Sequence, residues 1–194
     1  MGQQEKALAQ EGVGHLLLRF SIPIMLSYLV SELYSMVDTF FVGNYIGGLG
    51  VRSLNVVFPV QRILIAVAMM VALGVQTEVS NLLGQKHTEE ASTLMNEGNK
   101  LVLAINIPLI VLLFLVRAPL LVALGAGKEL MAASEVYLTG ILPGALFLAW
   151  GIYLTQLLLA LGKGRQAMVA TVIGALVNLV LDYLLVAKAG IGVG

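Results

Sequence analysis

Long apolar segments, separated by short polar or glycine-rich breaks, fill the chain from residue 16 onward. A run of roughly 20 apolar residues is long enough to cross the hydrocarbon core of a bilayer. Spanning segments must pair their own backbone polar groups, and these segments lack the two-residue alternation of barrel strands, so they are predicted to be helices. The pattern predicts five transmembrane helices, over residues 16–42, 54–83, 99–124, 130–161 and 166–187.

The segments outside these helices complete the predicted organisation. Residues 1–15 form a polar N-terminal segment, residues 16–189 form one transmembrane bundle, and the glycine-rich residues 190–194 begin a loop. In the polar connection 84–98, Thr88 and the two glutamates that follow it are placed to cap a short surface helix. The fold class is therefore an all-α, polytopic membrane helix bundle. Five spans put the two ends on opposite sides, and we expect the chain to be truncated.

Composition supports a membrane protein and excludes several other classes. Hydrophobic residues make up 59% of the 194 residues and charged residues 11%, whereas soluble domains carry about 25% charged residues. The net charge of zero gives no electrostatic case for nucleic acid. There is no cysteine, and His15 and His87 are far apart, so no metal site of three or four ligands is expected from them. We find no catalytic nucleophile–base set and no phosphate-binding loop, and predict no enzyme activity and no cofactor.

Charge and proline positions give further expectations. With the N-terminus inside, six basic residues fall on the inner side and five on or near the outer side. The positive-inside rule thus favours a cytoplasmic N-terminus by a narrow margin, in a multi-pass protein of the inner (plasma) membrane. Pro23 removes a backbone hydrogen bond early in the first helix and is the candidate hinge, although membrane helices also tolerate proline without such a role.

The most informative residues are carboxylates inside the spans, since an aspartate at the bilayer centre costs about 3 kcal/mol. Asp38 in the first helix has Tyr34, Ser31 and Ser27 on the same face, at offsets of −4, −7 and −11.

Asp182 in the fifth helix repeats this arrangement, with Asn178, Ala175 and Thr171 at the same offsets. Both aspartates fall at about the same point of helices that run in the same direction, so a shared pocket is possible. Two neighbouring carboxylates favour holding a proton, and carboxylate, amide and hydroxyl oxygens also suit a hard cation such as Na⁺. The alternative is that each aspartate lies near the interface and is solvated there.

Other polar and small residues receive structural interpretations. Glu32, Glu78 and Arg62 are expected to be solvated, paired or directed to the interface. The fourth helix carries small residues at intervals of four or seven that would let another helix approach closely, namely Gly140, Gly144, Gly151 and Thr155.

Several motifs, in order and spacing, resemble the multidrug and toxic compound extrusion (MATE) transporters over nearly the whole chain. They are Pro23 followed by Val37-Asp38-Thr39, then Gly43, Phe58-Pro59, the stretch 74–84, Asn178-x-x-x-Asp182 and residues 190–194. The resemblance implies the amino-terminal six-helix lobe of a two-lobe exporter, of which five helices are present. It also implies export of small cationic or amphipathic drugs in exchange for Na⁺ or H⁺, with the coupling ion at Asp38, Asn178 and Asp182, and with Tyr34 close by.

The implied partners are membrane lipids, the amphipathic substrates and the missing second lobe. Two other functions remain open at this stage. One is a flippase of related fold for lipid-linked precursors, for which Arg62 is the clear intramembrane cation. The other is a non-transporting membrane module that assembles through the glycine-lined face of the fourth helix.

Overall fold

A computed structural model describes residues 13–45 and 47–184, and every regular element in these ranges is a helix. The helices are α2 (Val13–Tyr45), α3 (Gly48–Gly84), α4 (Thr88–Leu115), α5 (Arg117–Ala123), α6 (Lys128–Ala160) and α7 (Gly164–Asp182). The all-α prediction is confirmed. Residues 1–12 of the predicted N-terminal segment and the predicted loop 190–194 lie outside the described residues.

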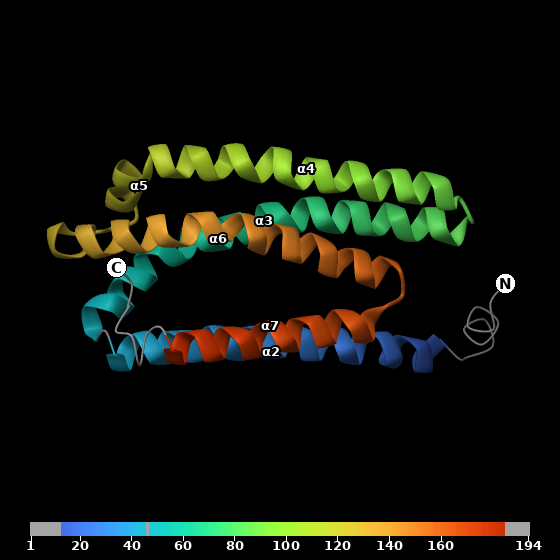
Figure 1. Cartoon of the computed structure of the whole chain (residues 1–194), viewed down its shortest axis with the longest axis horizontal. Helices are drawn as coiled ribbons and strands as arrows, with labels where there is room; N and C mark the ends of the chain where they lie inside the picture. The colour runs from blue at the N-terminus through green and yellow to red at the C-terminus, as the bar shows by residue number, and fades with distance from the viewer. Residues whose placement is uncertain (1–12, 46, 185–194) are drawn as a thin grey trace.

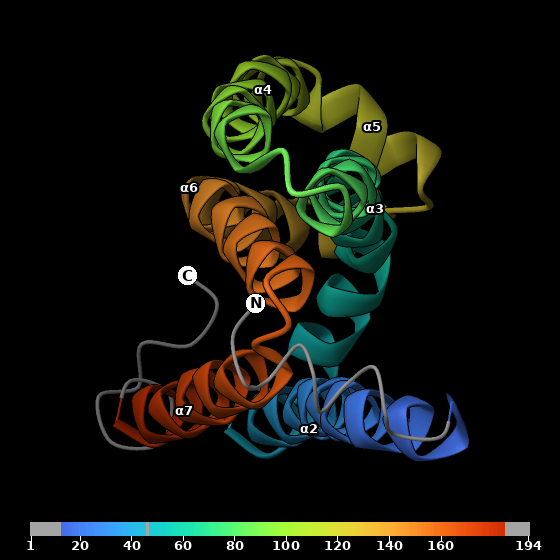
Figure 2. The same cartoon turned by 90° about the vertical axis from the view of Figure 1, so that its right-hand side faces the viewer.

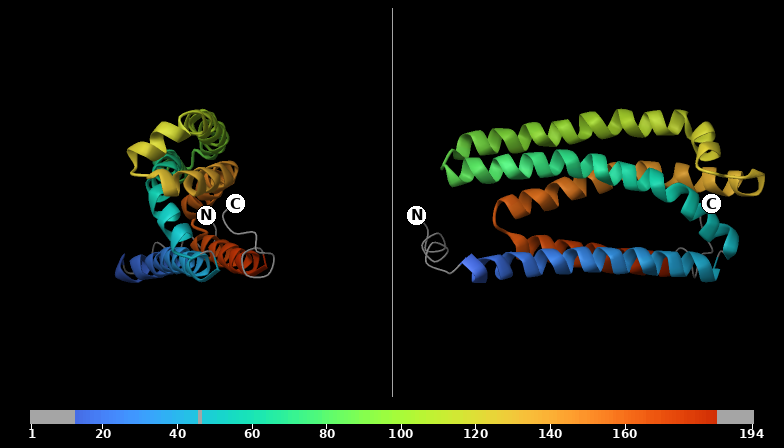
Figure 3. Two further views of the ribbon diagram at one scale, coloured as in Figure 1. Left: turned by 90° about the vertical axis from the view of Figure 1, so that its left-hand side faces the viewer. Right: turned by 180° about the vertical axis from the view of Figure 1, so that it is seen from behind.

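The helices form two groups, which Figures 1 and 2 show as separate layers. One group packs α3, α4 and α6 together, with the short α5 against α6. The other is the pair α2 and α7, which lie side by side and run in the same direction (Figure 1). The α2–α3 turn joins the groups at one end and the α6–α7 connection joins them at the other, as the view from behind in Figure 3 shows.

The third predicted span, 99–124, differs most from the structure. It begins earlier, because the polar residues after His87 continue into the apolar segment as one helix from Thr88 to Leu115. His87, not Thr88, is the N-cap, and no side chain caps this end, so the predicted separate surface helix is wrong. The helix then breaks at Val116, and Pro119 lies in the first turn of the next helix, where proline is tolerated.

The other helix boundaries lie close to those predicted, except at the first connection. The predicted connection 43–53 shrinks, since α2 reaches Tyr45 and α3 starts at Gly48. Gly47 takes a φ of 87°, a left-handed conformation that favours glycine. The end of the fifth predicted helix, 185–187, lies outside the described residues.

Three helices within the described residues are long and apolar enough to cross a membrane: α3, α4 and α6. The described apolar part of α7, Gly164–Val180, is shorter. The 37 residues of α3 make a helix of roughly 55 Å, which exceeds the hydrocarbon thickness of about 30 Å. The helix must therefore tilt or extend beyond the hydrocarbon layer.

The α3–α4–α6 group is held by close packing and by hydrogen bonds between helices. Two clusters of buried side chains fill it, one around Val75, Val102 and Tyr153 and one around Leu64 and Leu138. Lipid removes the hydrophobic force between helices, so packing and interhelical hydrogen bonds carry their association. The Tyr153 hydroxyl donates to the carbonyl oxygen of Met95.

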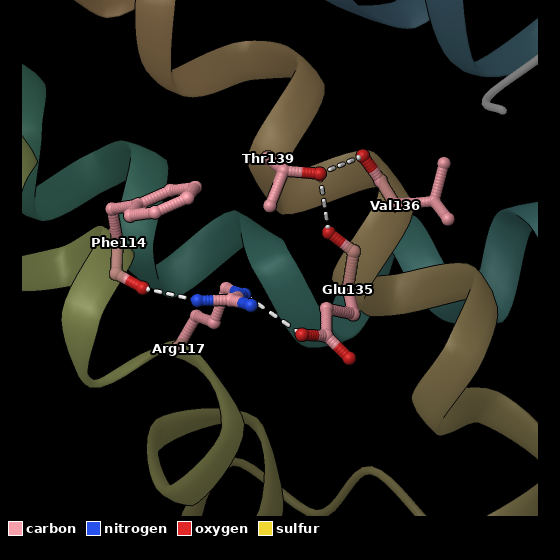
Figure 4. A network of polar contacts seen from close by, with 5 residues as sticks. All are labelled: Phe114, Arg117, Glu135, Val136 and Thr139. Carbon is pink, nitrogen blue, oxygen red and sulfur yellow. Dashed lines mark hydrogen bonds and ion pairs between the residues drawn. The ribbon is translucent and has the colours of Figure 1, made fainter.

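The break between α4 and α5 is fastened to α6 by a polar network, which Figure 4 shows. The Arg117 Nε donates to the Glu135 Oε1 at 2.7 Å, and its Nη1 donates to the carbonyl oxygen of Phe114 at 2.9 Å. The guanidinium also lies 4.7 Å from the centre of the Phe114 ring. One side chain thus satisfies a carbonyl group at the end of α4 and holds the start of α5 against α6.

We expect Arg117→Ala to lower the free energy of unfolding by about 1–2 kcal/mol, because it leaves a half-buried carboxylate without its partner. The midpoint of thermal unfolding in detergent measures this loss. Lys100→Ala is the matched control, since its ion pair with Glu97 is exposed and lies within a single helix. Equal midpoints for the two variants would show that the network does not stabilise the break.

Candidate functional site

A cavity of about 640 Å³ lies between the two helix groups, within the size range of small-molecule sites. Its described walls come from all four surrounding helices, namely Ile24 and Tyr28 of α2, Met69 of α3, Phe147, Leu148, Gly151, Ile152, Leu154, Thr155, Gln156, Leu158 and Leu159 of α6, and Ala167, Ala170, Thr171 and Gly174 of α7. Most of these side chains are apolar, so the cavity suits the apolar body of an amphipathic molecule.

A few polar groups interrupt the apolar wall. Thr155 and Thr171 donate their hydroxyl protons to the carbonyl oxygens of Gly151 and Ala167, at 2.9 and 3.1 Å. Their hydroxyl oxygens therefore remain available as acceptors. Gln156 is only 4% exposed, and its Nε2 donates to the Met69 sulfur at 3.5 Å, which joins α6 to α3 across one wall.

The predicted coupling residues lie on the two helices that pair. Asp38 is on α2, and Asn178 and Asp182 are on α7, which runs beside α2 in the same direction. Thr171 lines the cavity, which reaches Gly174, one turn before the half-buried Asn178. The parallel placement of these two helices agrees with the prediction.

Other parts of the predicted site lie outside the described residues. These parts are the side chains of Asp38, Asp182, Tyr34, Ser31 and Pro23. The convergence of the two carboxylates and the hinge at Pro23 therefore remain predictions. The backbone of α2 is helical through position 23.

Among the described residues, no helix packs closely on the glycine face of α6. Gly140, Gly144 and Gly151 are exposed, and no atom of the described residues lies within 4 Å of the place a Cβ would take. The periodic spacing puts these glycines on the side of α6 that turns away from α3 and α4. Close approach occurs instead at Gly98 of α4, where a Cβ would stand 2.7 Å from the Tyr153 hydroxyl oxygen.

Glu32 and Arg62, which the sequence leaves without a definite role, form an ion pair between α2 and α3. The Arg62 Nη1 lies 3.7 Å from the Glu32 Oε1, and the side chains are 63% and 65% exposed. Each residue stands roughly 20 Å along its helix from the α2–α3 turn. A charged side chain facing lipid at this depth costs about 3 kcal/mol, so this side of the lobe is expected to face a polar space.

Sequence patterns missed several buried polar residues, of which Gln156 is the one at the cavity. Asn106 and Ser134 are 1% and 0% exposed, and the Asn106 Oδ1 and Ser134 Oγ have no hydrogen-bond partner among the described residues. The sequence could have indicated Gln156, Asn106 and Ser134, since each is a polar residue inside an apolar span. Without an aspartate beside it, however, none stood out.

The described residues contain no cluster of three or more histidine, aspartate or glutamate side chains that could hold a metal ion. His87 instead lies 3.1 Å from the Glu90 carboxylate at the start of α4. The side chain of His15 lies outside the described residues. A coupling ion in the predicted site would have to use Asp38 or Asp182.

The fold and the cavity define the class as an integral-membrane helix bundle with a small-molecule space between two helix groups. The chain is 27% identical over 178 residues to the "FAD transporter" of Shewanella oneidensis, with 92% of this chain and 39% of that protein covered. It is 24% identical over 170 residues to the "Multidrug export protein MepA" of Staphylococcus aureus, covering 88% of this chain and 38% of that protein.

A solved structure gives the same assignment. It is described as the outward-facing conformation of a multidrug resistance MATE family transporter of the MOP superfamily, and it matches with a TM-score of 0.85 and 25% identity, over 91% of this chain and 39% of that one. The MatE family profile matches residues 23–184. The chain therefore belongs to the MatE family, and it spans about two-fifths of the length of these relatives.

Proposed function

We propose that this chain is the amino-terminal lobe of a cation-coupled exporter of small cationic or amphipathic compounds. The observation that carries the proposal is the apolar cavity of about 640 Å³, bounded on one side by α2 and α7. These are the helices that hold Asp38, Asn178 and Asp182. The substrate cavity and the coupling carboxylates thus share the same two helices. Binding at one of these sites therefore affects how the helices pack around the other.

The coupling step follows from electrostatics. Two carboxylates and one amide in a low-dielectric space favour taking up H⁺ or Na⁺, because the charge is then balanced and the oxygens are coordinated. An ion that binds one arrangement of α2 and α7 better than another shifts the lobe toward that arrangement. Pro23, in the cavity half of α2, is proposed to let that helix bend.

We propose that a second lobe completes the transporter. The chain spans about two-fifths of its relatives' length, and a second lobe would provide the opposite wall for alternating access. The relatives include an FAD transporter as well as a multidrug exporter. A site for lipid-linked or other phosphates would need several cations, whereas Arg62 has the Glu32 carboxylate 3.7 Å away, which disfavours a multiply charged phosphate.

Transport by the intact protein in proteoliposomes tests the proposal. A fluorescent amphipathic cation should accumulate against its gradient when a Na⁺ or a H⁺ gradient is imposed, and should stop when that gradient is collapsed. Accumulation that is indifferent to both gradients would overturn ion coupling. Absence of transport under every gradient would overturn the exporter assignment itself.

We further propose that the protein lies in the plasma (inner) membrane with its N-terminus in the cytoplasm. The α3–α4 connection lies at the same end of the bundle as the start of α2, and the α5–α6 connection lies at the other end (Figure 1). The chain has no cysteine, so single cysteines can report the orientation once any others in the intact protein are replaced. Lys128→Cys should react with a membrane-impermeant maleimide in whole cells, and Glu89→Cys only after permeabilisation. The reverse pattern would place the N-terminus outside.

A further inference from the structure

The Glu32–Arg62 pair bridges the two helix groups at a place where little else joins them. α2 packs chiefly on α7, and α3 packs chiefly on α6 and α4. Among the described residues, one ion pair joins α2 to α3: the Arg62 Nη1 lies 3.7 Å from the Glu32 Oε1. The pair therefore joins the two helix groups rather than lying within either one.

The pair lies outside the lining of the cavity, one to two helical turns from it along α2 and α3. Tyr28 stands one turn before Glu32 on α2, and Met69 stands two turns after Arg62 on α3, and both line the cavity. Because α2 and α3 are antiparallel across their turn, Tyr28 and Met69 both lie farther from that turn than the ion pair does. A molecule in the cavity with a polar end directed toward the α2–α3 turn would reach the ion pair.

Among the described residues, the ion pair leaves hydrogen-bonding capacity unused. Arg62 has five N–H donors, yet one long contact to Glu32 is its only polar interaction among the described residues. Pro59 and Ala66 flank Arg62 on the exposed side of α3, and neither carries a hydrogen-bonding side chain. Both charged side chains are about two-thirds exposed, so each has room and bonding capacity for a second partner.

Resting on the proposed function, we propose that this pair and the cavity form a binding site for zwitterionic amphipathic compounds. The apolar body occupies the cavity, the anionic group binds the Arg62 guanidinium, and the cationic group binds the Glu32 carboxylate. The ligand inserts between the two side chains and replaces one long contact with two short ones.

The preference for a zwitterion follows from charge balance. A purely cationic ligand that takes Glu32 leaves Arg62 without a counter-charge, and a purely anionic ligand that takes Arg62 leaves Glu32 in the same position. A bound ligand displaces water from both exposed side chains, and a charge that loses its water without gaining a counter-charge is costly. A ligand that carries both signs leaves neither side chain unpaired, so the site selects for both charges on one molecule.

Three xanthene dyes that share one ring system test the selectivity: a rhodamine with a free carboxylate (zwitterion), its methyl ester (cation) and fluorescein (anion). Their affinities for the purified intact protein are measured by fluorescence anisotropy without any ion gradient. We expect the zwitterion to bind about tenfold more tightly than either the cationic or the anionic dye. This preference should disappear in Glu32→Gln/Arg62→Gln, a double variant that leaves no lone charge in the bilayer.

Arg52→Gln is the matched control, because Arg52 is an exposed arginine near the outer end of the same helix, and it should keep the wild-type preference. Equal affinities in the wild type, or a zwitterion preference that persists in the double variant, would overturn the proposal. The proposal would also be overturned if fluorescein bound more tightly than the rhodamine dyes and lost this affinity in Arg62→Gln alone. That result would mark an anion site. Because no gradient is used, these outcomes can be read even if coupled transport fails.

Discussion

Replacing Gly98 by alanine is expected to lower the free energy of unfolding by about 2 kcal/mol. A Cβ at this position would stand 2.7 Å from the Tyr153 hydroxyl oxygen and 2.8 Å from the Val75 Cγ2. Both neighbours are buried, and the Tyr153 hydroxyl group is held by its hydrogen bond to the Met95 carbonyl oxygen. The added methyl group must therefore push α4 away from α3 and α6.

The sign of this effect is diagnostic, because alanine is favoured over glycine by about 1 kcal/mol inside an isolated helix. The midpoint of thermal unfolding in detergent measures it. Gly144→Ala is the matched control on α6, where nothing among the described residues lies within 4 Å of the added Cβ, and it should be neutral or slightly stabilising. A more stable Gly98→Ala variant would contradict the close contact between α4 and its neighbours.

Asp38→Asn and Asp182→Asn are each expected to reduce ion-driven efflux by at least about tenfold. Each change removes a charge-assisted interaction with the coupling ion, and such interactions contribute about 1.5–3 kcal/mol. Efflux from cells that express the intact protein, measured with an amphipathic dye, gives the rate. Binding of the dye without a gradient should change less, since the cavity walls remain.

Glu78→Gln controls for the loss of a carboxylate as such. Glu78 is exposed near the end of α3 and accepts a hydrogen bond of 3.4 Å from Asn81, so its replacement should leave efflux intact. If both aspartate variants pump as fast as the wild type, the coupling site lies elsewhere in the transporter.

The apolar segments predicted the helices well, because the length and hydropathy of a span are local properties of the sequence. The boundaries depended on other effects. The helix ends at Leu115, shortly before Pro119, but three other prolines lie inside continuous helices, so a proline alone does not mark a break. The polar stretch after His87 stays helical through acidic residues in its first turn and the Glu97–Lys100 pair, and length alone does not reveal this.

Residues that act across helices were harder to predict. The regular spacing of Gly140 and Gly144 suggested a packing face, whereas the single Gly98 makes the close approach, because contact depends on which side of a helix faces its neighbour. The pairing of Glu32 with Arg62 joins separate helices and follows from the short α2–α3 turn. The polar stripes around Asp38 and Asp182 are properties of single helices and are predicted from spacing, and they stay a prediction because both aspartate side chains lie outside the described residues.

The coupling site is tested most directly by asking whether positions 38 and 182 share one pocket. Asp38→Cys/Asp182→Cys, in the intact protein without other cysteines, places a thiol on each of the two paired helices. Cd²⁺ bridges two thiolates that lie within reach of one ion, so the double variant should bind it at least about tenfold more tightly than either single variant. Equal Cd²⁺ affinity in the double and single variants would show that α2 and α7 hold these positions apart, and would contradict the shared coupling site.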